Sequence, residues 1–218
     1  MNYSVIIVAA GQGKRFGFQN KLLLKIGEQT VIEKSISVFL QDPNCQKIII
    51  GVSKTISEFL ENKIKNLTKP VLLVEGGQTR AHTVLSCIKK VKTGNYLLIH
   101  DGARPFINLE FIHKILEPLK SYEGVIPGIK PSDTVKKITT SNLVSQTLNR
   151  DDLMLIQTPQ AFHFNKIEEA YYRWSDNDLH NVNDDSQILE NYSDNCYIKI
   201  IEGNPKNIKI TFPSDFKS

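Results

Sequence analysis

The sequence predicts an α/β fold with a mostly parallel sheet, helices on both faces and a projecting β-hairpin arm. Four apolar runs rich in Ile and Val recur at positions 5–8, 47–52, 71–74 and 96–99, and stretches with helical spacing separate them. Strands that are apolar on both faces and joined by helices form a parallel sheet that is covered on both sides. After position 127 this rhythm gives way to a polar hairpin, which has little apolar surface of its own to bury.

Two of the expected helices carry a start signal. Thr30 is followed by Glu33 and Thr55 by Glu58, and each pair has the spacing of a capping box, in which both side chains bond backbone N–H groups of the first turn. The spacing therefore predicts that helices begin after Thr30 and after Thr55.

The second half of the chain predicts the arm and the last elements. The stretch from Asp133 to Asn149 alternates around a turn at 140–142, which is typical of a hairpin. Helical spacing returns at 165–174 and 184–191, and strands are expected at 197–201 and 207–213. Because the hairpin is polar, we expect it to project and to pack against another copy of the chain.

Length and composition indicate a single domain of residues 1–218, with the arm at about 131–151. Of the 218 residues, 40% are apolar, enough for a substantial core. The 27 cations and 23 anions give a net charge of +4, too balanced for a protein that binds nucleic acid independently of its sequence. The three cysteines form no CxxC pair, the chain begins without the charged leader of a signal peptide, and no apolar run could span a membrane. We therefore expect a cytoplasmic protein with no nucleic-acid and no membrane partner.

The segment AAGQGKR at positions 9–15 follows the first apolar run and predicts a phosphate-binding loop. It is neither a P-loop nor a dinucleotide fingerprint, because Phe16 stands where the third glycine of the latter would be. The backbone N–H groups of a glycine-rich strand exit can still surround a triphosphate. Lys14, Arg15 and Lys21 lie close enough to neutralise it, and the alternative is a turn with solvated cations.

Two further segments follow the third and fourth apolar runs, where ligands of parallel sheets bind. In EGGQTRAHT, Gly76 and Gly77 allow the backbone to approach a base or a sugar closely, although an ordinary turn would also use them. In HDGARPF, Asp101 suits a divalent metal or a ribose hydroxyl, and Arg104 suits a phosphate; the alternative is that Asp101 caps a turn. The five histidines show no metal-ligand spacing and are expected to pack or to lie on the surface.

Two late segments offer more cations. Arg150 lies at the foot of the hairpin and Thr158 precedes a proline, a pattern that a turn with a surface ion pair would also explain. Lys209 lies among apolar neighbours of the last expected strand, where a lysine is costly unless it meets an anion. The alternative for Lys209 is an edge strand that turns it toward water.

Taken in order, the segments AAGQGKR, NKLLL, GGQTR, HDGARPF, SDTVKKI, QTPQAF and NIKIT resemble the 2-C-methyl-D-erythritol 4-phosphate cytidylyltransferases of the non-mevalonate isoprenoid pathway. The likeness runs over nearly the whole chain. It implies a Rossmann-like nucleotidyltransferase that transfers CMP from CTP to 2-C-methyl-D-erythritol 4-phosphate, releases pyrophosphate and requires Mg²⁺. It also implies a homodimer whose hairpin arms interlock.

The resemblance assigns roles to individual residues. Arg15, Lys21 and Lys209 match catalytic cations at the transferring phosphates. The nucleotide-binding set is Ala10, Gly11, Gln12, Gly13, Lys14, Gly76, Gly77, Arg80, Thr83 and Asp101, with Asp101 also near the metal. The acceptor-binding set, in part supplied by the partner's arm, is Arg104, Thr134, Arg150, Thr158 and Asn183.

Several positions depart from the usual pattern of this family, among them Asn20-Lys21-Leu22, where the family often has PKQ. Thr83 replaces a serine but keeps the hydroxyl. Asn183 replaces a threonine that helps to hold the acceptor, so the acceptor pocket is less well defined than the nucleotide pocket. Met154 replaces a tryptophan, and neither this change nor the one around Lys21 removes a charge that the chemistry needs.

Three other functions share parts of this pattern. A ribitol-5-phosphate cytidylyltransferase would carry most of the same motifs, although the small residues in HDGARP favour the erythritol enzymes. A nucleotide-sugar glycosyltransferase would use Asp176, Asn177 and Asp178 as its metal-binding DxD, but these follow a helix and suit a solvated loop. A nucleotide sensor without activity would not need to keep Arg15, Lys21 and Lys209.

Overall fold

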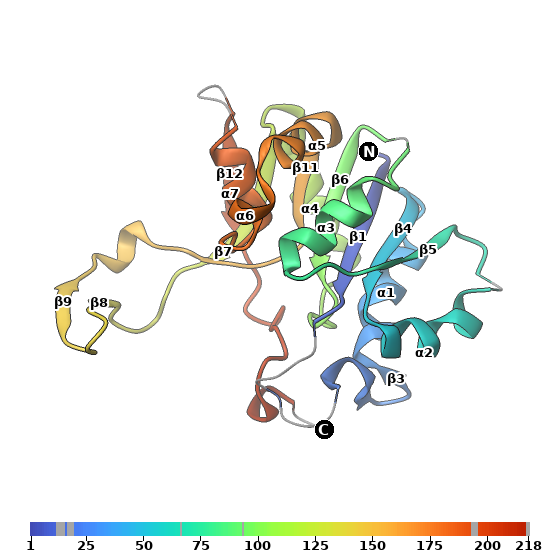
Figure 1. Ribbon diagram of the computed structural model, residues 1–218, viewed down its shortest axis with the longest axis horizontal. Helices are drawn as coiled ribbons and strands as arrows, with labels where there is room; N and C mark the ends of the chain where they lie inside the picture. Colours follow the sequence, from blue (N-terminus) through green and yellow to red (C-terminus); the bar gives the residue numbers. More distant parts are fainter. Residues whose placement is uncertain (12–15, 17–19, 66, 93, 193–195, 217–218) are drawn as a thin grey trace.

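The computed structural model describes residues 1–11, 16, 20–65, 67–92, 94–192 and 196–216 (Figure 1). Its strands are β1 (Tyr3–Ala9), β2 (Lys25–Ile26), β3 (Gln29–Thr30), β4 (Cys45–Val52), β5 (Val71–Glu75), β6 (Tyr96–Asp101), β7 (Gly124–Ile129), β8 (Lys136–Ile138), β9 (Val144–Thr147), β10 (Leu155–Ile156), β11 (Gln160–His163) and β12 (Ile198–Glu202). Its α-helices are α1 (Val31–Gln41), α2 (Lys54–Ile64), α3 (Arg80–Ile88), α4 (Leu109–Leu116), α5 (Phe164–Arg173), α6 (Asp176–Leu179) and α7 (Asp185–Glu190). Short 3₁₀ turns include η2 (Lys21–Leu23) and η4 (Arg150–Asp152).

The central sheet is mostly parallel, as the sequence predicts. Within the described residues it has eight strands, in the order β10-β7-β11-β6-β1-β4-β5 with β12 beside β7. Strand β1 pairs in parallel with β4 and β6, and β4 pairs in parallel with β5. Strand β11 runs antiparallel to β6. The carboxyl ends of β1, β4, β5 and β6 therefore meet at one edge of the sheet.

Helices cover both faces of the sheet, and each face has its own core. Along β1, Val5 and Ile7 point to the face covered by α1, α2 and α4, whereas Ile6 points to the face covered by α3, α5 and α7. This alternation follows from the two-residue period of a strand. It explains why the predicted strands are apolar on both faces, and Figure 1 shows the helices on the two sides of the sheet.

The two expected capping boxes have different outcomes. The Thr30 box is confirmed: its side chain accepts from the Glu33 N–H, and Glu33 Oε2 accepts from the Thr30 N–H at 2.8 Å. The Thr55 box is wrong, because α2 begins at Lys54 with Ser53 as its extended N-cap residue. Thr55 consequently lies inside the first turn, where it cannot serve as the cap.

The arm forms as expected and extends away from the body of the molecule (Figure 1). Strands β8 and β9 pair antiparallel, and Asn142 takes the left-handed conformation in the turn between them, with φ of 61°. Ile138, Leu143 and Val144 are exposed there.

Three elements differ from the expectations. The strand expected at 207–213 is wrong: the segment forms no ladder, and the Ile210 N–H instead bonds the carbonyl of Ala103 at 2.9 Å. The loop expected at 176–178 is the short helix α6. Strand β7 crosses Pro127, which obscured its signal. Among the described helices, none combines the length and apolar character that a membrane crossing requires.

Candidate active site

Several of the segments singled out in the sequence converge at the carboxyl edge of the sheet. Strands β1 and β4 end there at Ala9 and Val52, and β5 and β6 end at Glu75 and Asp101. Gln12, Gly13, Lys14 and Arg15 of the expected phosphate loop lie outside the described residues. This edge is therefore described by the site residues outside that loop.

Asp101 is a buried anion surrounded by cations. Its Oδ1 accepts from Arg80 Nε at 3.0 Å, and its Oδ2 lies 2.8 Å from Lys209 Nζ and 3.7 Å from Arg104 Nε. Burial favours the neutral acid, but Arg80, Lys209 and Arg104 outweigh it and hold the pKa of Asp101 well below its usual range. Asp101 is thus ionised and fixes three cations at the edge of the sheet.

Arg80 joins Asp101 to a second buried acid that the sequence analysis missed. Arg80 Nη1 lies 2.7 Å from Asp185 Oδ2, and the Tyr171 hydroxyl donates to Asp185 Oδ1 at 2.6 Å. The close contact of Arg80 Nη1 with Asp185 Oδ2 is an ion pair, and Arg80 Nη2 has no hydrogen-bond partner among the described residues. Burial raises the pKa of Asp185 despite Arg80, since this acid has one cation where Asp101 has three.

A chain of hydrogen bonds holds Asp101 from behind. The Asp101 N–H donates to Thr158 Oγ1 at 2.9 Å, and Thr158 Oγ1 lies 3.2 Å from His100 Nδ1. His100 Nε2 lies 3.1 Å from the carbonyl of Arg104 and must donate to it, which leaves Nδ1 as the acceptor for the Thr158 hydroxyl. Burial lowers the pKa of His100 to about 4, so this ring is neutral and structural, as expected for a packing histidine.

Arg104 is held on its other side by the segment that carries Lys209. Its Nη1 donates to the carbonyl of Asn207 at 2.7 Å, and the Asn207 amide donates to the carbonyl of Thr158 at 2.9 Å. Asn207 is fully buried, and the sequence analysis missed it. Burial lowers the pKa of Arg104, although the neighbouring Asp101 partly offsets this effect.

Lys21 and Lys209 approach the edge along the same segment. Lys21 Nζ donates to the carbonyl of Ile210 at 2.5 Å, next to Lys209. The alternative that Lys209 faces water is wrong, because its ammonium group pairs with Asp101. Lys21 thus contacts the backbone of the segment that carries Lys209, although the two residues are distant in the sequence.

The glycine pair after β5 is packed too tightly for side chains. A Cβ on Gly76 would lie 2.1 Å from the Cβ of Ala10, and one on Gly77 would lie 2.5 Å from the Cβ of His82. The Thr83 hydroxyl accepts from the Gly77 N–H at 3.1 Å, and its methyl group lies 2.3 Å from the place that a Cβ on Gly51 would take. Thr83 therefore shapes the segment expected to recognise the base.

The fold and the clustered cations can be compared with known proteins. The family model described as IspD, 2-C-methyl-D-erythritol 4-phosphate cytidylyltransferase, matches residues 3–218. The chain belongs to this cytidylyltransferase family. A relative of that name from Geobacillus thermodenitrificans is 35% identical over 99% of this chain and 94% of its own length. One from Clostridioides difficile is 36% identical over 98% of this chain and 90% of its own length.

Solved structures of the cytidylyltransferase family have the same fold. The 4-diphosphocytidyl-2C-methyl-D-erythritol synthase of Anaerococcus prevotii is 30% identical, with a TM-score of 0.84 over 98% of this chain and 94% of its own. The cytidylyltransferase of Francisella tularensis is also 30% identical, with a TM-score of 0.82 over 99% of this chain and 96% of its own. The α/β Rossmann-like fold and the enzyme class, a nucleotidyltransferase, are thereby confirmed.

The residues expected to bind the acceptor are not all together in one chain of this cytidylyltransferase. Arg104 and Thr158 lie beside Asp101, but the Thr158 hydroxyl already bonds the backbone of Asp101. Thr134 and Arg150 are exposed at the arm, where Arg150 Nη1 donates to the carbonyl of Ser132 at 2.9 Å beside a cavity of about 330 Å³. A direct contact of Thr158 with the acceptor stays a prediction.

Asn183 lies on a different cavity of the cytidylyltransferase. That cavity measures about 390 Å³ and also borders Met154, so two of the family departures face the same space. The Asn183 N–H donates to Gln187 Oε1 at 2.9 Å. No contact in the described residues joins Asn183, Thr134 or Arg150 to Asp101.

The expected metal role of Asp101 does not fit its surroundings in this cytidylyltransferase. Both carboxylate oxygens already contact cations, and three positive groups would repel a divalent ion at contact distance. The nearby acid, Asp185, is fully buried behind Arg80. Asp101 therefore holds cationic side chains in this arrangement, and a requirement for Mg²⁺ stays a prediction.

Proposed function

We propose that this chain transfers CMP from CTP to 2-C-methyl-D-erythritol 4-phosphate and releases pyrophosphate, and that the carboxyl edge of the sheet is where the transfer occurs. The observation that carries the proposal is the fixed group of cations around Asp101. Arg80, Arg104 and Lys209 surround one ionised acid there, and Lys21 reaches the neighbouring backbone. Positive charge at the carboxyl ends of parallel strands is suited to a nucleoside triphosphate.

The reaction requires positive charge that stabilises the phosphates, and it requires no covalent intermediate with the enzyme. An oxygen of the acceptor's phosphate attacks the α-phosphorus of CTP in line, and the bond from that phosphorus to pyrophosphate breaks. Two anions must approach each other, so Coulomb repulsion is the main barrier. Lys21 and Lys209 supply opposing charge from fixed positions, and Arg15 is proposed to do the same from the loop outside the described residues.

The nucleotide is proposed to lie between the glycine pair and the loop after β1. Gly76 and Gly77 offer backbone at close range for the cytosine, and Ala10 to Lys14 form the triphosphate cradle. Thr83 and Arg80 act by position, since Thr83 bonds the Gly77 N–H and Arg80 holds Asp101. Before CTP binds, Asp101 keeps Arg80, Arg104 and Lys209 in place. Its oxygens are proposed to reach the ribose once bound CTP draws one of these side chains away from the carboxylate.

The acceptor site is proposed to be shared between two chains. One chain leaves Arg150 and Thr134 on its arm, away from Asp101, while Ile138, Leu143 and Val144 are exposed on the same arm (Figure 1). An isolated two-stranded hairpin has little stability in water, so a partner that covers these apolar side chains stabilises it. A homodimer in which each arm carries Arg150 and Thr134 to the other chain would complete the acceptor site and cover the exposed apolar side chains.

We also propose that the enzyme is cytoplasmic.

The family match favours the erythritol acceptor over ribitol 5-phosphate. The glycosyltransferase alternative has no support in the structure, because Asp176 begins the short helix α6 and pairs with His82 at 3.0 Å. The DxD triplet is therefore absent from the group of residues around Asp101.

The test is to incubate the purified enzyme with CTP and, separately, each of the two polyol phosphates, and to follow pyrophosphate release. Release with the erythritol phosphate that exceeds release with ribitol 5-phosphate supports the proposal, whereas the reverse order supports the alternative. Lys21→Ala is the control for a contaminating activity. Adding EDTA in a parallel series tests the metal requirement. An unchanged rate of pyrophosphate release would show that no metal ion is required.

A further inference from the structure

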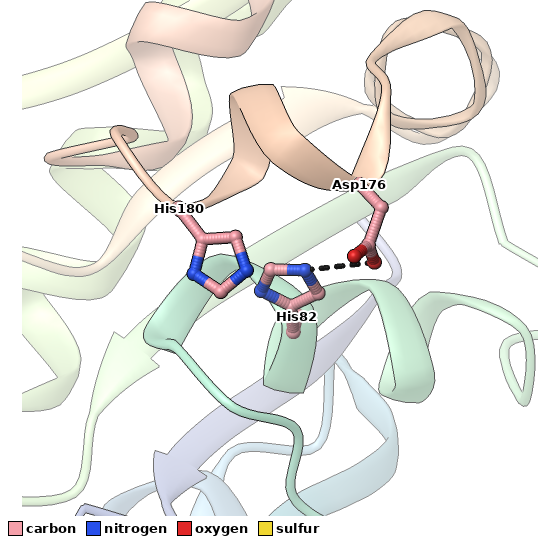
Figure 2. Close-up of side chains that lie close together, drawn as sticks. All are labelled: His82, Asp176 and His180. Atoms are coloured by element: carbon pink, nitrogen blue, oxygen red, sulfur yellow. Dashed lines mark hydrogen bonds and ion pairs between the residues drawn. The ribbon is translucent and has the colours of Figure 1, made fainter.

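Two histidines and an aspartate lie together where α6 meets the start of α3, outside the group around Asp101 (Figure 2). His82 lies in the first turn of α3, and Asp176 and His180 lie one turn apart at the two ends of α6. One ligand atom from each residue lies within 4.8 Å of those of the other two. Two imidazoles and a carboxylate are ligands that suit Zn²⁺ and similar borderline ions.

His82 is already oriented as a ligand. Its Nδ1 lies 2.7 Å from Thr79 Oγ1, and its Nε2 lies 3.0 Å from Asp176 Oδ1. The Thr79 hydroxyl donates to the carbonyl of Leu179 at 3.3 Å, so its oxygen can accept a hydrogen bond from Nδ1–H. In the tautomer with the proton on Nδ1, Nε2 has a lone pair for a metal ion that replaces its bond to Asp176, and this is the arrangement that metal-binding histidines use.

The other two side chains have room to close around an ion. Asp176 has a side chain that is 78% exposed, and His180 is exposed. Figure 2 shows the His180 ring beside the His82 ring. The centroids of the two rings are 4.8 Å apart. Zn–N bonds of about 2.0–2.1 Å place neighbouring ligands about 3.3 Å apart, so only a small rotation of the two surface side chains is needed.

We propose that His82, Asp176 and His180 bind one divalent ion of the Zn²⁺ class, with water completing the coordination. The ion replaces the hydrogen bond between His82 and Asp176 and joins α6 to the first turn of α3. That turn also carries Arg80, which holds Asp101 and Asp185. The ion is therefore a structural clamp on the helix that positions the central arginine, and its binding does not depend on the proposed reaction.

The test is Zn²⁺ binding to the untagged, nucleotide-free full chain, measured by titration calorimetry and by metal analysis after dialysis. A Cys196→Ser background removes the cysteine that is only partly buried. We expect about one ion per chain, and a loss of affinity of more than about tenfold in each of His82→Ala, Asp176→Asn and His180→Ala. Co²⁺ provides an optical probe, because the intense visible bands of a four-coordinate ion should disappear in the same variants.

His113→Ala is the matched control. His113 also lies 3.0 Å from a carboxylate, that of Asp42, but it belongs to no described group of three ligands. Binding that survives in His113→Ala and is lost in His180→Ala, with an unchanged circular dichroism spectrum, supports the site. The proposal is overturned if the parent protein shows no saturable binding, or if His180→Ala binds Zn²⁺ as tightly as the parent.

Discussion

The backbone N–H of Asp101 donates a hydrogen bond to the side-chain oxygen of Thr158 at 2.9 Å. These two residues come from β6 and from the segment before β11, and the bond is buried. It fixes the backbone of the acid around which the cations gather. The position of the positive charge at the edge of the sheet thus depends on a threonine hydroxyl.

Replacing Thr158 with valine should lower the free energy of unfolding by about 1–3 kcal/mol, because the buried Asp101 N–H loses its acceptor. Catalysis should weaken as well, since Asp101 and its cations lose their support. Thermal unfolding and kcat/KM measure the two effects. Thr158→Ser keeps the oxygen and should restore both, and a valine variant of unchanged stability would show that this bond is dispensable.

Replacing Lys209 with alanine should lower kcat by about 10²- to 10³-fold, as the loss of one preorganised charge at a transferring phosphate does elsewhere. The nearby, exposed Lys206→Ala is the matched control and should leave kcat unchanged. Steady-state kinetics with saturating CTP decide the matter. Equal kcat values for Lys209→Ala and Lys206→Ala would show that Lys209 has no catalytic role.

Replacing Gly11 with alanine should spare folding and weaken the use of CTP. Among the described atoms, nothing lies within 4 Å of the place that a Cβ on Gly11 would take. The glycine is therefore not required by packing there, and its purpose is expected to be the close approach of a phosphate, so kcat/KM should fall by about 10²-fold. An unchanged melting temperature together with unchanged kinetics would exclude a cradle at this position.

His100 should make the protein less stable in mild acid. Burial lowers the pKa of His100 to about 4, so between pH 6.5 and pH 4 the unfolded chain binds a proton that the folded chain does not. Stability therefore falls as the pH falls through this window, by up to about 3 kcal/mol from this group. Denaturant unfolding at a series of pH values should show a shallower decline for His100→Asn, and parallel curves would contradict the assignment.

Arg150→Ala should raise KM for the polyol phosphate and change KM for CTP little, because the arm lies away from the nucleotide residues. Mixing it with Lys21→Ala protein tests the shared site. A mixed dimer unites one intact Lys21 with one intact Arg150, so up to roughly a quarter of wild-type activity should return after random exchange. Proven exchange without recovery would mean that Arg150 serves its own chain.

Much of the site was predictable because its segments follow strands with strong apolar patterns. Asp101, Gly76 and Gly77 stand at strand ends that the sequence marks clearly, and parallel strands bring such ends together. Asp185 and Asn207 were missed because each gains its role from a distant partner, Arg80 and Arg104 respectively. Contacts between residues that are distant in the sequence cannot be predicted from spacing along the chain.

The same limit explains the histidines. His82 and His180 have no metal-ligand spacing in the sequence, yet α3 and α6 place their rings side by side. The strand expected at 207–213 failed for a related reason. In this segment the Asn207 carbonyl accepts a hydrogen bond from Arg104, and Lys209 pairs with Asp101. These contacts with the edge of the sheet take the place of hydrogen bonds to a neighbouring strand.

The contact between Thr83 and Gly51 restricts the order in which this protein can change during evolution. The methyl group of Thr83 occupies the space above Gly51, so the Cβ introduced by Gly51→Ala would meet it at 2.3 Å. The substitution Thr83→Ser keeps the hydroxyl that bonds the Gly77 N–H and removes the obstructing carbon. A Cβ at position 51 would still meet Cys87 Sγ at 3.1 Å, so that sulfur must also shift slightly. A lineage that acquires Thr83→Ser first therefore meets the smaller obstruction when Gly51→Ala follows, whereas a lineage that begins with Gly51→Ala meets both.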